Sequence, residues 1–390
     1  MIRLILLTDF TESYAHQLLK GIMDYSKKHE PWVLCRMPPA FKQQYGIEGI
    51  LNWAKRWKAD AIIAQFNSGD NVDLFRKNGI TAVAQDYNSR FTTIPNITSN
   101  YKLTGKMVAE FFLQRGFKNF AFFGYKNACW SQERCEGFKD EIAKYGFTDN
   151  FYAFHNQKLE ELWFYKQHPL SKWLKSLPKP IAMMACDDTQ GQIITEICKL
   201  SNIRIPEDIA LMGVDNDEMT CNLSDPSLSS VLLDVEKGGY NTARLIDSMV
   251  KSKNFDSYKD IYISTSYIVQ RQSTNIYPIQ DKEIARALKF IDECKLEKIN
   301  VEDVVKQVAL SRRLLEIRFK QFTKMSVYQY IMKKKMDVFA QLLIESKAPV
   351  TEIAAQLGIT DMKNLSRQFK TIEGCSPLQY RKEHSPNKKI

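Results

Sequence analysis

The sequence lacks the long apolar runs and the clustered metal-ligating residues that mark several classes of protein. No run approaches the roughly 20 apolar residues that a helix needs to cross a bilayer. The apolar start at residues 1–9 is too short for a signal peptide and has no small-residue cleavage site. The eight cysteines form no CxxC pair, and no histidine stands at a spacing that suits zinc. We therefore expect no membrane association, no metal and no cofactor, and free thiols in a reducing compartment, the cytoplasm.

Motifs of common enzymes are also missing. After the first predicted strand, residues 8–13 offer no glycine-rich phosphate loop, and the chain contains neither a G-x-S-x-G nor an H-E-x-x-H motif. Only five histidines are spread along the 390 residues, which gives little support to a catalytic triad. We expect that the protein is not an enzyme.

Positive charge is concentrated near the C-terminus. Residues 281–390 contain 22 Lys and Arg against 14 Asp and Glu, a net charge of +8. Residues 1–280 contain the other 33 and 31, a net charge of +2. A chain of 390 residues, 44% of them hydrophobic, is long enough for two or three domains with cores of their own. The charge distribution indicates that a polyanion binds at the C-terminal part, and a basic solvated face is the alternative.

The larger first part of the chain alternates short apolar runs with amphipathic stretches of helical length. We predict strands at residues 3–7, 61–65, 81–85, 120–123, 181–185, 209–214 and 262–269. We predict helices at residues 14–28, 102–115, 132–144, 189–200 and 237–250. Apolar strands that alternate with helices are typical of parallel sheets covered on both faces. At this length the pattern favours two α/β lobes over one large sheet, with a ligand cleft at the carboxyl ends of the strands.

Acidic residues follow several of the predicted strands, namely Asp9, Asp86, Asp187 with Asp188, and Asp215. Each has two interpretations, because an Asp after a strand is also a common helix N-cap. If several converge on one cleft, they would supply the fixed acceptors that a sugar requires, and aromatic rings would stack on its apolar face. The aromatic candidates for that role are Phe10, Tyr14, Tyr87 and Trp130, each of which could instead be an ordinary core or surface residue.

The alternation ends near residue 271, and every later pattern is helical. We therefore place a bilobal α/β domain at residues 1–274, a linker at residues 275–283, and an all-helical domain at residues 284–390. The helical part contains a duplication, because residues 312–320 and 363–370 each hold a Leu, a Phe four residues later and then a Lys. Each basic segment follows a short amphipathic helix and a turn. Two such helix pairs predict a tandem helix-turn-helix that reads double-stranded DNA.

The duplicated spacing also predicts which residues meet DNA. Leu and Phe four residues apart share one helix face, so the remaining side chains face outward. If Leu315 and Phe319 enter the core, the major groove would meet Arg312, Arg313 and Glu316, together with Ile317. If Leu365 and Phe369 do the same, it would meet Lys363, Asn364, Ser366 and Arg367. Lys320, Lys370 and the lysines at 333–335 would contact phosphates or solvent.

The end of the sequence resembles a known family. Residues 358–370, Gly-Ile-Thr-Asp-Met-Lys-Asn-Leu-Ser-Arg-Gln-Phe-Lys, and residues 374–381, Gly-Cys-Ser-Pro-Leu-Gln-Tyr-Arg, closely resemble the signature of AraC-type regulators. Ile353-Ala354 matches the start of that signature. Ile359 and Leu365 depart from it, since the family usually has Phe and an aromatic residue there. Both changes keep an apolar side chain at a core position, so the implied tandem helix-turn-helix fold is little affected.

The first 274 residues resemble the sugar-sensing core of LacI/GalR repressors and periplasmic sugar-binding proteins. The resemblance rests on residues 116–124, 205–216, 226–231 and 271–274, and it is weaker before residue 95. It implies a bilobal α/β fold of the type I periplasmic-binding-protein-like class. The DNA-binding headpiece that precedes this core in LacI-type repressors has no counterpart before the first predicted strand.

A sugar sensor followed by a tandem helix-turn-helix is similar to the order in bacterial xylose-operon regulators, which are transcriptional activators that bind xylose. The resemblance implies ligand contacts at Asn100, Arg134, Asp187 and Asp215, although Arg134 could instead form a surface salt bridge. Asp9, Tyr14 and Trp130 complete the candidate ligand site. The implied partners are a small sugar such as xylose, promoter DNA, RNA polymerase and a second copy of the chain in a homodimer.

Two other functions stay open at this point. One is a DNA-binding regulator whose first domain serves dimerisation or partner binding without a small effector. The other is a secreted or membrane-tethered sugar-binding protein, which the missing signal segment and the basic C-terminal part oppose. Ligand-dependent thermal stabilisation would separate the first alternative from a sugar-responsive regulator.

Overall fold

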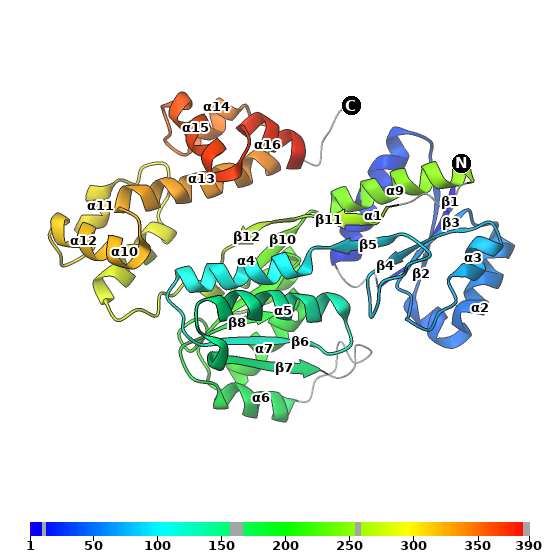
Figure 1. The fold of residues 1–390 in the computed structure, drawn as a ribbon, viewed down its shortest axis with the longest axis horizontal. Helices are drawn as coiled ribbons and strands as arrows, with labels where there is room; N and C mark the ends of the chain where they lie inside the picture. Colours follow the sequence, from blue (N-terminus) through cyan, green and yellow to red (C-terminus); the bar gives the residue numbers. More distant parts are fainter. Residues whose placement is uncertain (10–12, 157–166, 254–258, 385–390) are drawn as a thin grey trace. The chain divides into compact units, whose positions relative to one another are not determined.

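The computed structural model describes residues 1–9, 13–156, 167–253 and 259–384. The chain divides into two compact units (Figure 1). The first comprises Met1–Leu113 and Lys118–Thr274, and the second comprises Gln114–Phe117 and Asn275–Ile390. Phe10, one of the aromatic candidates, lies outside the described residues.

The described part of the first unit contains two six-stranded sheets, which confirms the predicted bilobal α/β fold. The first sheet has the order β11-β5-β4-β3-β1-β2, with β11 at Ile261–Ile263, β5 at Asn96–Ser99, β4 at Thr81–Gln85, β3 at Ala61–Ala64, β1 at Arg3–Leu7 and β2 at Val33–Met37. The second has the order β12-β10-β9-β8-β6-β7, with β12 at Thr265–Val269, β10 at Ser229–Leu233, β9 at Ile209–Val214, β8 at Ile181–Ala185, β6 at Phe120–Tyr125 and β7 at Phe151–Asn156. The central strands β3, β4, β6, β8 and β9 are buried along their whole length, as expected for parallel strands covered on both faces.

The prediction of one strand at residues 262–269 is wrong. The segment breaks at Ser264, whose carbonyl oxygen accepts a hydrogen bond from the backbone N–H of Asp234 at 2.9 Å. The part before the break, β11, pairs in parallel with β5 of the first sheet. The part after it, β12, pairs antiparallel with β10 of the second sheet. The sequence does not indicate the change of sheet, because the residues on both sides of the break favour a strand conformation equally.

Helices flank both sheets of the first unit. They are α1 at Ser13–Lys28, α2 at Pro39–Trp57, α3 at Asp73–Lys77, α4 at Tyr101–Gln114, α5 at Cys129–Lys144, α6 at Gln167–Ser176, α7 at Asp188–Leu200, α8 at Glu218–Leu223 and α9 at Val235–Ser252, with short 3₁₀ turns at Thr148–Asn150 and Gln272–Thr274. Helices α1 and α9 lie side by side (Figure 1), and glycines let their backbones touch. A Cβ on Gly21 would lie 1.8 Å from the carbonyl oxygen of Glu236, and a Cβ on Gly239 would lie 2.1 Å from that of Leu18.

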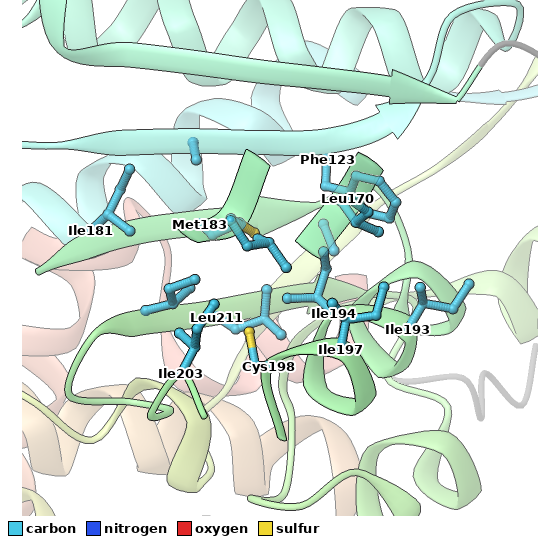
Figure 2. Close-up of a cluster of buried hydrophobic side chains, with 14 of the residues drawn as sticks. Phe123, Leu170, Ile181, Met183, Ile193, Ile194, Ile197, Cys198, Ile203 and Leu211 are labelled. Carbon is cyan, nitrogen blue, oxygen red and sulfur yellow. The ribbon is translucent and has the colours of Figure 1, made fainter. Parts of the chain in front are cut away.

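Each sheet has an apolar core of its own. Around the first sheet the core includes Ile5, Ile62 and Phe75, all without exposed surface. Figure 2 shows the cluster of the second sheet, in which strand residues such as Met183 and Leu211 meet Ile194 and Ile197 of α7. Each sheet is thus stabilised by its own core. These cores fix the ends of the strands from which the polar candidate residues follow.

The described part of the second unit is helical apart from its connecting loops. Its helices are α10 at Lys282–Glu293, α11 at Val301–Lys306, α12 at Arg312–Thr323, α13 at Val327–Glu345, α14 at Val350–Gln356, α15 at Met362–Glu373 and α16 at Pro377–His384. The prediction that the duplicated Leu and Phe enter the core is confirmed. Leu315 and Phe319 belong to one apolar cluster and Leu365 and Phe369 to another, each side chain at most 1% exposed. Ile359 and Leu365, the two departures from the AraC-type signature, also pack in the second cluster.

We expect the lysines at 333–335 to contact phosphates or solvent, but two of them do not. They lie on α13, which connects the two helix pairs. Lys334 Nζ lies 2.7 Å from the carboxylate of Asp292 on α10, and Lys335 is only 6% exposed. The first helix of this unit begins at Lys282, two residues before the start that we predicted for the helical domain. Among the described residues, no helix is long and apolar enough to cross a membrane, and no group of three metal-ligating side chains occurs.

Candidate ligand site and nucleic-acid interface

Arg134 lies at the centre of the polar cluster in the first unit. It is 3% exposed and projects from α5. One guanidinium nitrogen donates a hydrogen bond to the carbonyl oxygen of Cys186, and another lies 3.5 Å from Oδ1 of Asp215. The guanidinium carbon also lies 5.4 Å from the ring centroid of Tyr101 and 5.2 Å from that of Trp130. Stacking of this kind suits a planar guanidinium, and it fixes the group in one orientation.

Helix α5 begins at Cys129, three residues earlier than we predicted, and this extension positions the site. Trp130 and Arg134 are four residues apart on the same helix, so their side chains share a face. Ser131 anchors the start of the helix, because its Oγ accepts a hydrogen bond from the backbone N–H of Tyr125 at the end of β6. The ring of Tyr125 in turn meets Trp130 edge-on, with centroids 5.9 Å apart.

Two carboxylates near Arg134 come from the carboxyl ends of neighbouring strands; Asp215 contacts it, and Asp187 interacts with its charge. Asp187 follows β8 and caps α7, since Oδ1 accepts a hydrogen bond from the backbone N–H of Gln190 at 2.7 Å. Asp215 follows β9 with a backbone φ of +100°, an uncommon conformation for a residue other than glycine. Burial raises the pKa of Asp187 to about 6, and burial also raises the pKa of Asp215. The cluster therefore holds carboxyl groups that lack the solvation they have in water.

The first lobe contributes Asp86, which follows a strand of the first sheet, and Tyr14 of α1. Asp86 follows β4, is 4% exposed, and accepts a hydrogen bond from Arg90 at 3.0 Å. Arg90 also pairs with Glu133 of α5 at 2.8 Å, so the two sheets are joined next to the site. Burial, followed by the charges of Asp86 and Asp215, raises the pKa of the Tyr14 hydroxyl, and the charge of Arg134 opposes them. Tyr14 therefore lies within electrostatic reach of residues that follow strands of both sheets.

Buried polar atoms of the cluster are left without partners. Among the described residues, neither Oε1 of Gln85 nor Nε of Arg134 has a hydrogen-bond partner. An unpaired buried polar atom costs roughly 1–3 kcal/mol, so the arrangement favours a ligand that supplies the missing donors and acceptors. Carboxylates, an Arg fork and aromatic rings together can bind a small polyhydroxylated molecule through its hydroxyl groups and an apolar ring face.

The structure brings some of the predicted ligand residues together and leaves others apart. The structure brings together Arg134, Asp187, Asp215, Tyr14 and Trp130. Asn100 stands directly before α4 with an exposed side chain, and its Oδ1 accepts a hydrogen bond from the N–H of Leu103, so it caps the helix. Asp9 is half-buried at the end of β1, next to the undescribed residues 10–12. Tyr87 follows Asp86, and its carbonyl oxygen accepts a hydrogen bond from the N–H of Cys129 at 3.1 Å.

Sequence reasoning left Tyr101 and Arg90 out of the site. Tyr101 is 6% exposed and stacks on Arg134, and its position directly after Asn100 was the available signal. Arg90 joins Asp86 to Glu133 across 43 residues of sequence, and nothing in a single sequence marks such a pair. Asp86 did carry a signal, because it follows a buried strand in the same way as Asp187 and Asp215.

In the second unit, Ser311 and Asp361 cap the two helices of interest. The side chain of Ser311 accepts from the N–H of Leu314 in α12, and that of Asp361 accepts from the N–H of Asn364 in α15. These are the second helices of the two pairs, α11–α12 and α14–α15. Their caps fix where each helix begins, and hence which side chains stand in its first exposed turn.

The candidate groove residues of α12 differ in their contacts. Arg312 and Arg313 are exposed, and Arg312 forms an ion pair with Glu302 of α11. Glu316 is half-buried, and its carboxylate accepts a hydrogen bond from the backbone N–H of Val327, the first residue of α13. A carboxylate is stabilised at a helix N-terminus, so Glu316 has a structural contact and we leave it out of the proposed DNA-contacting set.

The candidate residues of α15 form one outward surface. Lys363, Ser366 and Arg367 are exposed, and Asn364 is half-buried. Oδ1 of Asn364 accepts hydrogen bonds from Arg367 at 3.1 Å and from Gln368 at 3.3 Å. The Asn364 amide therefore holds the Arg367 guanidinium, and Arg367 is exposed while Leu365 and Phe369 are buried.

Comparison with known proteins agrees with this division of the chain. Residues 109–274 match a family model described as a periplasmic binding protein-like domain, and residues 304–383 match a helix-turn-helix domain. The chain is 26% identical to the xylose operon regulatory protein of Escherichia coli strain K12, over 98% of this chain and 97% of that protein. The protein of the same description from Haemophilus influenzae is also 26% identical, over 83% of this chain and 84% of that protein.

Solved structures show the same fold. One described as a xylose-binding transcription activator superimposes with a TM-score of 0.58 at 23% identity and covers 98% of both chains. A LacI family transcriptional regulator from Enterococcus faecium with bound ribose superimposes with a TM-score of 0.59 at 18% identity, over 71% of this chain and all of that chain. The first similarity extends over both units, and the second corresponds in length to the first unit.

Proposed function

We propose that this protein is a sugar-responsive transcription regulator that binds DNA through its second unit. The domain matches and the relatives that align over nearly the whole chain support this function. The observation that carries the ligand half is the cluster of buried Arg134 with half-buried Asp187 and Asp215 beside Trp130. Those relatives are transcription regulators, which agrees with our expectation that the chain is not an enzyme.

The effector is a small sugar, and xylose is our candidate. Asp187 and Asp215 accept from hydroxyl groups, Arg134 donates to adjacent oxygens, and Trp130 covers the apolar face of the ring. Xylose itself is suggested by what the full-length relatives are called, since the residues alone fit any small polyhydroxylated ring. Tyr14 of α1 interacts electrostatically with Asp86 of its own lobe and with Arg134 and Asp215 of the other, so a sugar bound at this cluster would contact both lobes and favour their closure.

The second unit reads double-stranded DNA with α12 and α15. Arg312, Arg313, Lys363, Asn364, Ser366 and Arg367 are the proposed DNA contacts. Arg312 exchanges its exposed ion pair with Glu302 for DNA, which costs little because a solvated surface pair is weak. The protein is proposed to act as a cytoplasmic homodimer that engages two half-sites and RNA polymerase as an activator, an expectation drawn from the resemblance to xylose-operon regulators.

A thermal stability screen tests the ligand half. The full chain is melted with D-xylose, D-ribose, L-arabinose, D-glucose and cellobiose. A sugar at 100 times its dissociation constant adds about 2.7 kcal/mol, which corresponds to a rise of several degrees for a domain of this size. Arg134→Gln should abolish the shift. Arg204→Gln is the matched control, because Arg204 is an exposed arginine of the same unit that forms an ion pair with Asp208.

The outcome also separates the two regulator hypotheses. A shift with D-xylose that disappears in the folded Arg134→Gln variant supports a sugar effector. If no sugar shifts the melting temperature while the chain still binds DNA specifically, the first unit serves dimerisation or partner binding and the proposed effector is rejected.

A further inference from the structure

A short piece of the chain leaves the first unit and is built into the second. Residues Gln114–Phe117 follow directly from the body of α4, and they belong to the helical unit. Gly116 has a φ of +88°, and a Cβ there would lie 2.6 Å from Ile279 and 3.0 Å from the ring of Phe322. Phe117 is only 1% exposed. The segment is therefore packed into the helical unit with no room for a larger residue at Gly116.

Arg115 is the polar anchor of this segment. It is 3% exposed, and its Nη2 donates a hydrogen bond to Oδ2 of Asp292 at 2.9 Å. Its Nη1 donates to the hydroxyl of Tyr277 at 3.0 Å, and the guanidinium lies 4.8 Å from the centroid of the same ring. The Tyr277 hydroxyl donates to Oδ2 of Asp292 at 2.6 Å. The Arg115 guanidinium, the Tyr277 hydroxyl and the Asp292 carboxylate thus form a buried triangle of mutual hydrogen bonds.

Asp292 connects this triangle to the helix between the two DNA-binding pairs. Lys334 of α13 lies 2.7 Å from Oδ1 of Asp292, and the neighbouring Lys333 donates to Oε1 of Gln114 at 3.3 Å. Burial raises the pKa of Asp292, but Arg115 and then Lys334 outweigh it and hold the pKa below its usual value. The carboxylate is therefore charged at neutral pH, and within the second unit it connects α10 with α13 and with the segment Gln114–Phe117.

The other end of α4 lies at the candidate ligand site. Tyr101, its first residue, stacks on Arg134 of α5. Glycines bring the two helices into backbone contact, since a Cβ on Gly105 would lie 2.1 Å from the carbonyl oxygen of Arg134 and a Cβ on Gly137 would lie 2.0 Å from that of Lys102. Helix α4 is 14 residues long, about 21 Å. Arg134 therefore lies on the surface against which α4 packs.

We infer that α4 and the buried Arg115–Asp292 pair couple occupancy of the ligand site to the DNA-binding unit, with Arg115 as the positioning residue. The inference rests on the proposed function. A buried ion pair resists separation, because a displaced partner leaves an uncompensated charge in the interior. When α4 shifts on ligand binding, α10 and α13 follow it through Asp292. Because α13 connects the two helix pairs, the shift changes how α12 and α15 are presented to DNA.

The test measures a coupling factor, the ratio of DNA dissociation constants without and with saturating D-xylose. The DNA is a duplex recovered by selection from a random library with the full-length protein. Coupling factors of this kind are roughly 5–150-fold. Arg115→Met should bring the factor close to 1 while D-xylose affinity in the absence of DNA stays within about threefold of wild type. Lys106→Ala is the matched control, because Lys106 forms an ion pair with Glu110 on the surface of the same helix and should leave the factor unchanged.

A second variant covers the case in which Arg115→Met does not fold. Tyr277→Phe keeps the ring and removes only the hydroxyl that lies between Arg115 and Asp292, so it should lower the coupling factor partway. A purely structural role would weaken DNA binding equally with and without D-xylose and leave the ratio intact. A wild-type ratio in a folded Arg115→Met or Tyr277→Phe variant would overturn the inference. A wild-type protein whose DNA affinity ignores D-xylose would instead overturn the proposed function.

Discussion

The ionisation of Asp187 gives the sharpest prediction for the ligand site. Burial raises its pKa from 3.8 to about 6, and protonation turns one carboxylate oxygen from an acceptor of sugar hydroxyls into a hydrogen-bond donor. With that pKa, about 90% of the molecules carry the charge at pH 7 and about 10% at pH 5. Sugar affinity should therefore fall about tenfold between pH 7 and pH 5, because the protonated site must first lose a proton.

The same group affects stability in the opposite direction. Its pKa is higher in the folded protein than in the unfolded chain, so protonation favours the folded state. The contribution of Asp187 to stability is largest below about pH 4 and is lost as pH rises through about 6. Protonation of Asp187 should therefore lower sugar affinity without unfolding the protein, so a loss of affinity on acidification is not explained by unfolding at this residue.

Isothermal titration with D-xylose from pH 7.5 to 5.0 measures the effect, with Asp187→Asn as the control variant. Asn caps a helix about as well as Asp, so α7 should keep its start while the titrating group is removed. Asp215 also has a raised pKa, and the comparison between the two proteins isolates the part that belongs to Asp187. An affinity that is constant over this range, or an equal pH dependence in Asp187→Asn, would refute the reasoning.

Three further predictions concern DNA binding and packing. Arg367→Ala should weaken binding to the selected duplex by about 1–3 kcal/mol and relax discrimination at one base position, as measured by fluorescence anisotropy against single-base variants; equal affinities for all variants would reject the orientation of α15. Phe369→Ala should lower the unfolding free energy by about 3–5 kcal/mol in chemical denaturation, because the ring is fully buried. Gly239→Ala should lower the melting temperature, since its Cβ would lie 2.1 Å from the Leu18 carbonyl oxygen, whereas Gly69→Ala, with nothing within 4 Å, should not.

Much of the fold could be predicted because local patterns were consistent with the final packing. The Leu–Phe spacing identified the buried faces of α12 and α15, since a helix keeps the same periodicity in any surroundings. The acidic residues after β4, β8 and β9 also indicated correctly that polar residues gather at the carboxyl ends of these strands. In each case one stretch of sequence held the whole signal.

The remaining features depend on contacts between distant segments. The break at Ser264 requires knowledge of both sheets, because the residues on either side are equally suited to a strand. The placement of Arg115 in the helical unit depends on Tyr277 and Asp292, more than 160 residues later in the chain. Glu316 looked like a groove residue because its helical position is outward, and only the start of α13 shows what its carboxylate contacts.

Titration of the selected DNA duplex with the full-length protein, with and without saturating D-xylose, tests the central claim most directly. The account predicts that the two dissociation constants differ at least fivefold, and that DNA shifts the D-xylose affinity by the same factor. Equal dissociation constants for a protein shown by calorimetry to be saturated with D-xylose would contradict it.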